Sequence, residues 1–554
     1  MMMKYMVRKN FWDNNRLVGI NTRFLFSSAM LMASTSVVAA DNKQDTDKYN
    51  FLVIVCEDIS PYLGCYGDSV AVSPHLDNFS QDAIRHEYMF TCVGVSSPSR
   101  YSLITGRHSS TDGANYMRVS NFIKGYGVVP PDGVKCFSEL MREQGYYTTN
   151  NAKTDYQFGV PVSAWDEQGN QAHWRHAPKD MPFLSIFNLN ITHESQIWEQ
   201  GKNELFVKPE DVKLPPYYPD NAVVRHDMAV MYSNIKRMDD DFQRLLAELE
   251  ASDRADNTIV IFYSDNGGPI PRGKRELKDS GTRVPFMIRF PDRRGKGTTN
   301  EEMNMFVDVP ATILSLANIK IPSYMHGRAM YGSQKGKERK FVFGATDRFD
   351  ANVEKRASIR DKRYLYIYNY MNETSNYKPV AYRLNMPMMK NMVELYQKGE
   401  LNAVQRLWFD APAPREELYD CVEDPHQIHN LADIPAYQPL LKQMRKSFRK
   451  EWIQPYNKEW ETHDEQYFIN RSWPQGHKPQ AEEPQYIVKD NKMKVLNASD
   501  KLSVTYQING IGLNGDSKHW RLYTGEIPVK QGDVVKIRAN RIGYKNSEIV
   551  TVSL

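Results

Sequence analysis

Residues 51–58 read Phe-Leu-Val-Ile-Val-Cys-Glu-Asp, an unbroken apolar run of strand length that ends directly in two acidic side chains. A continuous apolar run is typical of a strand buried on both faces, as in a parallel sheet covered by helices. Residues 258–263, Thr-Ile-Val-Ile-Phe-Tyr, repeat the pattern and lead into Ser-Asp-Asn-Gly at 264–267. Because ligands bind at the carboxyl ends of such strands, the two polar endings predict a site at one edge of the sheet.

Helical patterns lie around and between these two runs. We expect a helix over about 76–85, a second that starts near Pro98, and a long amphipathic helix over 223–250. Helices that alternate with buried strands predict an α/β fold, with a large sheet flanked by helices, for residues 48–335.

The texture of the sequence changes after this region. Residues 336–472 contain Tyr-rich strand patterns such as 364–370 and a helical pattern near 435–452, which predict a smaller α+β subdomain. A Pro- and charge-rich linker follows at 473–485. The short β-type runs of 486–554, separated by Asn-Gly, Thr-Gly and Gln-Gly turns, predict a small terminal β-sandwich module.

The first 40 residues are typical of a secretory signal peptide. Basic side chains precede an apolar run at 24–40 that ends in Val-Ala-Ala, the small-residue pattern of a cleavage site. The alternative is a membrane anchor, but the run contains Ser and Thr and is shorter than the ~20 strongly apolar residues that a span needs. We therefore expect export, with no stable membrane insertion.

The formal charge of the chain gives no sign of a nucleic-acid partner. The 554 residues carry a formal net charge of +4, but residues 1–40 hold five basic side chains and one acid. Their removal leaves a net charge of zero, so any polyanion must be bound by a local cationic pocket. The five Cys residues are odd in number and lack zinc-site spacing, and we expect mostly buried free thiols.

Residues 96–108 read Ser-Ser-Pro-Ser-Arg-Tyr-Ser-Leu-Ile-Thr-Gly-Arg-His. A Pro with Ser and Thr neighbours is typical of a helix start, but that interpretation gives no reason for Arg100. A helix N-terminus beside an arginine forms a cradle for an anion. The segment resembles the sulfatase signature: Cys or Ser, any residue, Pro-Ser-Arg, and Thr-Gly further on. In that family the first residue of the signature, here Ser96, becomes formylglycine.

The resemblance implies an alkaline phosphatase-like fold with a large mixed sheet, and an enzyme that hydrolyses sulfate groups. In the family, one hydroxyl of the hydrated formylglycine attacks sulfur, and loss of a proton from the other expels sulfate. A Ser precursor resembles the bacterial form, which a maturase, a radical enzyme, modifies before export. It therefore implies a periplasmic or secreted bacterial protein.

Family members bind a calcium ion through carboxylates after the first strand and an Asp-Asn pair after a later one. The matching positions here are Glu57, Asp58, Asp265 and Asn266, with the formylglycine from Ser96 beside them. An isolated Asp-Asn-Gly is more often a simple turn. Three carboxylates and an amide nevertheless make an all-oxygen set that suits a hard divalent cation. Glu57 departs from the usual Asp.

The resemblance also implies groups that bind and protonate the substrate. Lys153 and Lys274 match the two lysines that bind the sulfate group, and Arg100 belongs to the signature itself. His193 matches a substrate-contacting histidine and is a candidate acid for the leaving group. Asp155 stands where the family has the histidine that is thought to deprotonate the hydrated aldehyde, so Asp155 is a candidate base or an orienting group.

Three further segments, 213–220, 264–271 and 460–464, are similar to the heparan N-sulfatase branch of the family. The sequence thus predicts a sulfatase of a sulfated oligosaccharide, with heparin- or heparan-derived N-sulfoglucosamine as one candidate. An O-sulfatase of another polysaccharide has the same features. Two alternatives stay open: a phosphatase or phosphonate hydrolase of the same superfamily that uses unmodified Ser96, and a glycan-binding protein without catalysis.

Overall fold

The computed structural model describes residues 48–513, 515 and 517–554, which belong to one compact unit. The predicted signal peptide at 1–40 lies outside the described residues. Within the described part of the chain, no helix has both the length and the apolar character that a membrane span requires.

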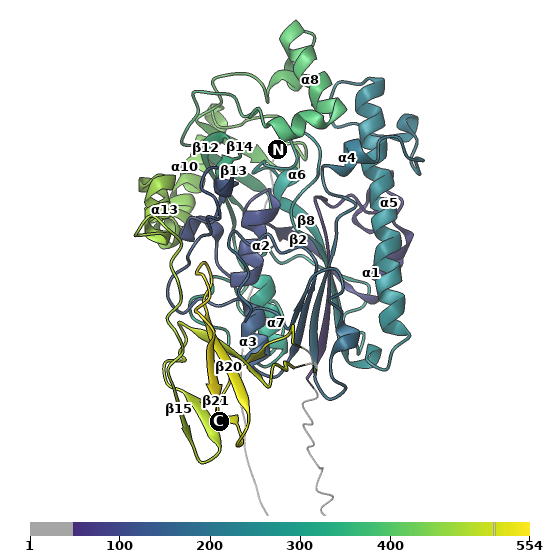
Figure 1. Ribbon diagram of the computed structural model, residues 1–554. Helices are drawn as coiled ribbons and strands as arrows, with labels where there is room; N and C mark the ends of the chain where they lie inside the picture. The colour runs from purple at the N-terminus through teal and green to yellow at the C-terminus, as the bar shows by residue number, and fades with distance from the viewer. Residues whose placement is uncertain (1–47, 514, 516) are drawn as a thin grey trace, which may run out of the picture. The chain divides into compact units, whose positions relative to one another are not determined.

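A mixed sheet forms the centre of the large domain (Figure 1). Its middle strand β1 pairs in parallel with β6 on one side and with β7 on the other. β4 continues the parallel part beyond β6, and β8 runs antiparallel to β7. The nine strands found among the described residues are β10 (Asn304–Met305), β2 (Ile84–Phe90), β8 (Arg283–Arg289), β7 (Thr258–Ser264), β1 (Asn50–Cys56), β6 (Phe183–Leu189), β4 (Tyr147–Asn151) and β5 (Glu167–Gln168), with β9 (Thr298–Asn300) beside β2.

Strand β1 is buried on both faces, as its continuous apolar run predicts. Leu52, Ile54 and Cys56 pack in one core with the helices α1 (Pro74–Asp82) and α5 (Ala222–Glu250). The alternate side chains Phe51, Val53 and Val55 pack in a second core on the other face. The helices of that face are α2 (Ser96–Thr105), α3 (Phe137–Glu143) and α7 (Asp308–Leu316) (Figure 1).

A second sheet forms the smaller subdomain. Its strand order is β14 (Glu416–Asp420), β13 (Tyr364–Asn369), β12 (Asn352–Arg360), β11 (Val342–Phe349) and β3 (Tyr116–Met117). The edge strand β3 comes from the first half of the chain, so the two predicted parts share this sheet. Its core packs against the helices α10 (Gln438–Ser447), α12 (Lys458–Thr462) and α13 (Glu465–Ser472). The remaining helices are α4 (Gln196–Glu199), α6 (Asp279–Thr282), α8 (Pro387–Lys398), α9 (Ala403–Arg406) and α11 (Gln454–Tyr456).

The C-terminal β module consists of two small sheets that share one apolar core. It also touches the large domain, because Arg142 donates to the backbone oxygen of Trp520 at 2.8 Å and Arg541 pairs with Asp132 at 2.6 Å. The strands of the two sheets are β15 (Tyr486–Lys489), β16 (Lys492–Val495) and β19 (Ile527–Pro528), and β18 (Arg521–Leu522), β17 (Ser503–Ile508), β20 (Val534–Asn540) and β21 (Val550–Ser553).

The helix predicted over 76–85 was too long. It ends at Asp82, and the chain enters β2 at Ile84 because Ile84 to His86 pair with β8. The helix predicted near 435–452 is also interrupted, since a 3-10 turn precedes α10 and a π-helical stretch, Phe448–Ile453, follows it.

Candidate active site at the carboxyl edge of the sheet

Four parallel strands end at the same edge of the large sheet, and the predicted site residues follow them. Glu57 and Asp58 follow β1, and Asp265 and Asn266 follow β7 with Ser264 as the last strand residue. His193 follows β6, and Lys153 follows β4. The sheet order therefore brings segments more than 200 residues apart into contact.

Ser96 is the first residue of α2 and is 2% exposed. Its Oγ donates to Asn266 Oδ1 at 3.2 Å, which links the helix N-terminus to the end of β7. One turn into the helix, Arg100 Nε donates to Asp265 Oδ2 at 2.9 Å. The backbone N–H groups of a first helical turn and a nearby guanidinium together favour an anion at Ser96.

Asp58 is the most connected carboxylate of the site and is fully buried. Its Oδ1 accepts from Asn266 Nδ2 at 2.8 Å, and its Oδ2 accepts from Lys274 Nζ at 2.7 Å. The backbone N–H of Asp58 donates to Asp265 Oδ1 at 3.2 Å. Burial lowers the pKa of Lys274, but Asp58 and Glu194 outweigh it and hold that pKa above its ordinary value.

Glu57 points toward the other half of the site. Its Oε2 accepts from Lys153 Nζ at 2.7 Å and lies 3.9 Å from His193 Nε2. Burial raises the pKa of Glu57, and Lys153 partly offsets this effect. Burial, Lys274 and Lys153 lower the pKa of His193 to about 2, so this imidazole is neutral.

Glu194 is a site residue that sequence reasoning missed. It accepts from both terminal nitrogens of Arg275 at 2.8 and 2.7 Å, lies 3.4 Å from Lys274 Nζ, and donates its backbone N–H to Asp58. Glu194 thus fixes the loop after β6 against the loop that carries Lys274. Its position directly after His193, behind a buried strand, was the available signal.

The chain is similar to known proteins over nearly its whole length. A family model described as Sulfatase matches residues 49–319, and one described as N-sulphoglucosamine sulphohydrolase, C-terminal matches residues 272–408. An ulvan-active sulfatase of Formosa agariphila is 36% identical over 548 residues, which cover 92% of this chain and 91% of that protein. The chain belongs to the sulfatase family.

Other relatives of this sulfatase are more distant. Human N-sulphoglucosamine sulphohydrolase is 24% identical, over 75% of this chain and 90% of that one. A solved 2-O GAG sulfatase superimposes with a TM-score of 0.56 at 18% identity, over 76% of this chain and 94% of that one. The phosphonate monoester hydrolase of Agrobacterium radiobacter superimposes with a TM-score of 0.54 at 16% identity, over 73% of this chain and 96% of that one. These structures confirm the predicted fold, and they do not separate sulfatase from phosphonate hydrolase chemistry.

Asp155, the candidate base or orienting group, lies beside Arg118. Its Oδ1 lies 3.7 Å from Arg118 Nη1, and this ion pair is the only polar side-chain contact of Asp155 among the described residues. The carboxylate has no contact with Ser96, Lys153 or Glu57 in this part of the chain. Asp155 itself adopts a left-handed backbone conformation, with φ of 50°.

The donor atoms of the predicted metal ligands suit a hard cation, but one of the four ligands, Glu57, is turned to another partner. Asp58, Asp265 and Asn266 contact one another and are fully buried, which suits a hard cation. Glu57 is instead held by Lys153. Among the described His, Cys, Asp and Glu residues, only His75, Asp239 and Asp240 bring three potential ligand atoms within 4.8 Å of one another, and Asp239 already caps the backbone of α1 there.

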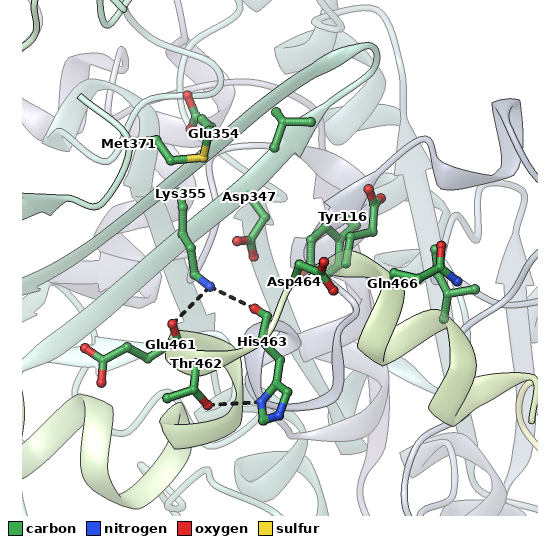
Figure 2. A pocket seen from close by; sticks show the side chains of 13 residues that line it. Tyr116, Asp347, Glu354, Lys355, Met371, Glu461, Thr462, His463, Asp464 and Gln466 are labelled. Carbon is green, nitrogen blue, oxygen red and sulfur yellow. Dashed lines mark hydrogen bonds between the residues drawn. The ribbon is translucent and has the colours of Figure 1, made fainter. Parts of the chain in front are cut away.

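Residues 461–464, part of the segment noted for its similarity to heparan N-sulfatase, line a crevice that contains none of the predicted site residues (Figure 2). Its volume is about 490 Å³, and β12 and the α12–α13 connection line it. Lys355 crosses the crevice and donates to the backbone oxygen of His463 at 2.9 Å. Trp460 donates to the buried Asp347, whose pKa burial raises to about 7. These contacts join α12 to the second sheet and give this segment a structural role.

Proposed function

We propose that this sulfatase removes sulfate groups from a polysaccharide by means of a formylglycine formed from Ser96. The observation that carries the proposal is the buried Ser96 at the start of α2, in contact with Asn266 and one turn from Arg100. Members of the family in general depend on formylglycine and a metal ion. The hydrated aldehyde would supply one hydroxyl that attacks sulfur and a second hydroxyl whose loss of a proton expels sulfate.

The protein's own side chains bind the sulfate ester and steer protons. Arg100 contacts Asp265, Lys153 contacts Glu57 and Lys274 contacts Asp58. We propose that these three cations also donate hydrogen bonds to the sulfate group at the helix N-terminus. His193 is neutral and donates a hydrogen bond from Nε2 to the leaving oxygen. We propose that Asp58, Asp265 and Asn266, with Glu57, hold a calcium ion.

The preferred substrate is an ulvan-type polysaccharide. The ulvan-active relative matches nearly the whole chain at 36% identity, whereas the human N-sulphoglucosamine enzyme matches 75% of it at 24%. N-sulfoglucosamine is the second candidate, because the C-terminal family model of that enzyme matches residues 272–408. We also propose that a maturase oxidises Ser96, taking two hydrogens from its side chain, before export to the periplasm or the medium.

Sulfate release measured side by side on defined ulvan oligosaccharides and N-sulfoglucosamine tests the proposal. The protein is first checked by mass spectrometry for loss of two hydrogens at Ser96. We expect release from ulvan oligosaccharides by modified protein, and none by a Ser96→Ala variant. Release by unmodified protein, faster turnover of a phosphonate ester, or binding of the glycan by fully modified protein without turnover would each refute it.

A further inference from the structure

A polar pocket of about 440 Å³ opens directly beside the active site. Two of its lining residues, Ser97 and Thr154, are each the immediate neighbour of a site residue, Ser96 and Lys153. The pocket therefore begins where the sulfate-binding groups end. A substrate whose sulfate group lies at Ser96 has this space for the part of the glycan next to the sulfated position.

The walls of this pocket combine an aromatic ring with fixed polar groups. Tyr126 is partly exposed and supplies ring surface, on which the apolar face of a sugar packs. Gln157 is held in place, because its Nε2 donates to the backbone oxygens of Ala114 at 2.9 Å and Tyr116 at 3.2 Å. The wall is thus organised before any ligand arrives, which reduces the entropy lost on binding.

Arg118 is the only cationic side chain that lines the pocket, as far as the described residues go. Its side chain is 44% exposed, and it makes no side-chain hydrogen bond to the described protein. Asp155 lies 3.7 Å away, which is an ion-pair distance beyond hydrogen-bond range. The guanidinium is therefore oriented by charge while its N–H donors stay available.

Backbone strain is concentrated at the same place. Arg118, Asp155 and Gln157 have positive φ angles of 69°, 50° and 63°, in the left-handed region that side-chain-bearing residues seldom adopt. Such residues persist where the surroundings hold them, commonly at ligand sites. Two of these three residues, Arg118 and Asp155, form the ion pair of this pocket.

We infer that Arg118 binds an anionic group, a carboxylate or a second sulfate, on the sugar next to the sulfated one, and that Asp155 is a positioning residue for Arg118. The inference rests on the proposed function. The planar guanidinium matches either anion with two parallel hydrogen bonds. Asp155 limits the positions of Arg118, so the guanidinium is oriented before the anion binds.

Steady-state kinetics of the formylglycine-containing enzyme test the inference. The substrates are ulvan oligosaccharides, their carboxyl-reduced counterparts, counterparts without the neighbouring sulfate, and 4-nitrophenyl sulfate, which has no neighbouring sugar. Arg118→Ala should raise KM for the anionic oligosaccharide about tenfold, the scale of one charge-assisted interaction. The wild-type enzyme should have a higher KM for either the carboxyl-reduced or the desulfated oligosaccharide, and the group missing from that substrate is the anion that Arg118 binds. Arg118→Ala should remove this difference in KM, and Arg118→Lys should give a KM between those of the wild type and Arg118→Ala.

Asp155→Asn separates positioning from base catalysis. A positioning role predicts that kcat on 4-nitrophenyl sulfate stays within about tenfold, with the main change in KM for the anionic oligosaccharide, because loss of a general base costs about 10²–10⁴-fold. Arg244→Ala, at a 57% exposed arginine on α5, is the matched control and should change neither constant.

Two results would overturn the inference. One is an Arg118→Ala enzyme that keeps its KM and its preference among the oligosaccharides. The other is a loss of 100-fold or more in kcat for Asp155→Asn on 4-nitrophenyl sulfate, which would make Asp155 the base. A modified wild-type enzyme that releases no sulfate from any of the substrates would instead refute the proposed function, so the two failures are distinguishable.

Discussion

Replacing Glu417 with Gln should destabilise the protein strongly without touching its chemistry. Glu417, in β14, is 1% exposed and accepts hydrogen bonds from Lys278 Nζ at 2.6 Å, Tyr419 OH at 2.6 Å and Asn369 Nδ2 at 2.9 Å. Lys278 belongs to the large domain, so the contact joins the two sheets. Gln keeps the volume but leaves Lys278 buried without its anion, which costs about 3–5 kcal/mol.

The loss should also depend on pH in a defined direction. Burial raises the pKa of Glu417, but Lys278 and Arg356 outweigh burial and hold it well below the ordinary value of 4.5. A depressed pKa means that the carboxylate stabilises the fold above that ordinary value, and that this stabilisation is lost as the pH falls toward the folded pKa. The difference between wild type and variant should therefore shrink as the pH falls below about 4.5, by up to about 1.4 kcal/mol per unit.

Urea unfolding followed by intrinsic fluorescence, at several pH values, measures both effects. Glu423→Gln is the control, since that side chain is 75% exposed and should change stability by less than about 0.5 kcal/mol. The kcat of the folded Glu417→Gln variant at low temperature should match that of the wild type. A change below about 1 kcal/mol at pH 7, or a difference that does not shrink in acid, would refute the reasoning about a buried charge.

Three other predictions can be checked with simple assays. Ser96→Ala should lose sulfate release to the background rate and keep the thermal unfolding temperature of the wild type, as measured by ion chromatography and calorimetry. Chelation should remove activity and lower the unfolding temperature, and calcium should restore both. Because all five cysteines are free and only Cys65 and Cys421 are partly exposed, a thiol reagent should modify at most two in the native protein and all five after unfolding; a stoichiometry below five after unfolding would indicate a disulfide.

Much of the fold could be predicted because its central strands contain long apolar runs. The runs at 51–56 and 258–263 are apolar throughout, and only a strand with both faces covered buries every one of those side chains. The helix at Ser96 was also predictable, because Pro98 and its Ser neighbours favour a helix start. Strand β2 was missed, since its side chains at Arg85 and Glu87 are polar and its conformation depends on pairing with β8.

The site was predictable residue by residue where a strand end fixed the position, and not where a loop did. Asp58 and Asp265 follow buried strands, so their meeting depends on the sheet order alone. Asp155 lies in a loop whose direction depends on a left-handed residue, and a sequence without Gly at that point gives no sign of it. The Glu194–Arg275 pair likewise needs two loops to meet, which no local pattern encodes.

The charges around Ser96 suggest why metal and sulfate belong together in this site. Ion pairs link four carboxylates to four cationic side chains, and the formal charges of the eight groups cancel. The carboxylates are Glu57, Asp58, Glu194 and Asp265, and the cations are Arg100, Lys153, Lys274 and Arg275. A neutral set of this kind has little net attraction for an anion. A divalent cation held by the Asp58 side of the cluster would leave a surplus of two positive charges beside the N-terminus of α2, which matches the charge of released sulfate. A bound metal ion would therefore do more than orient the reacting group, because it would convert a balanced network of ion pairs into an anion site, and chelation should weaken sulfate binding even in the Ser96→Ala variant.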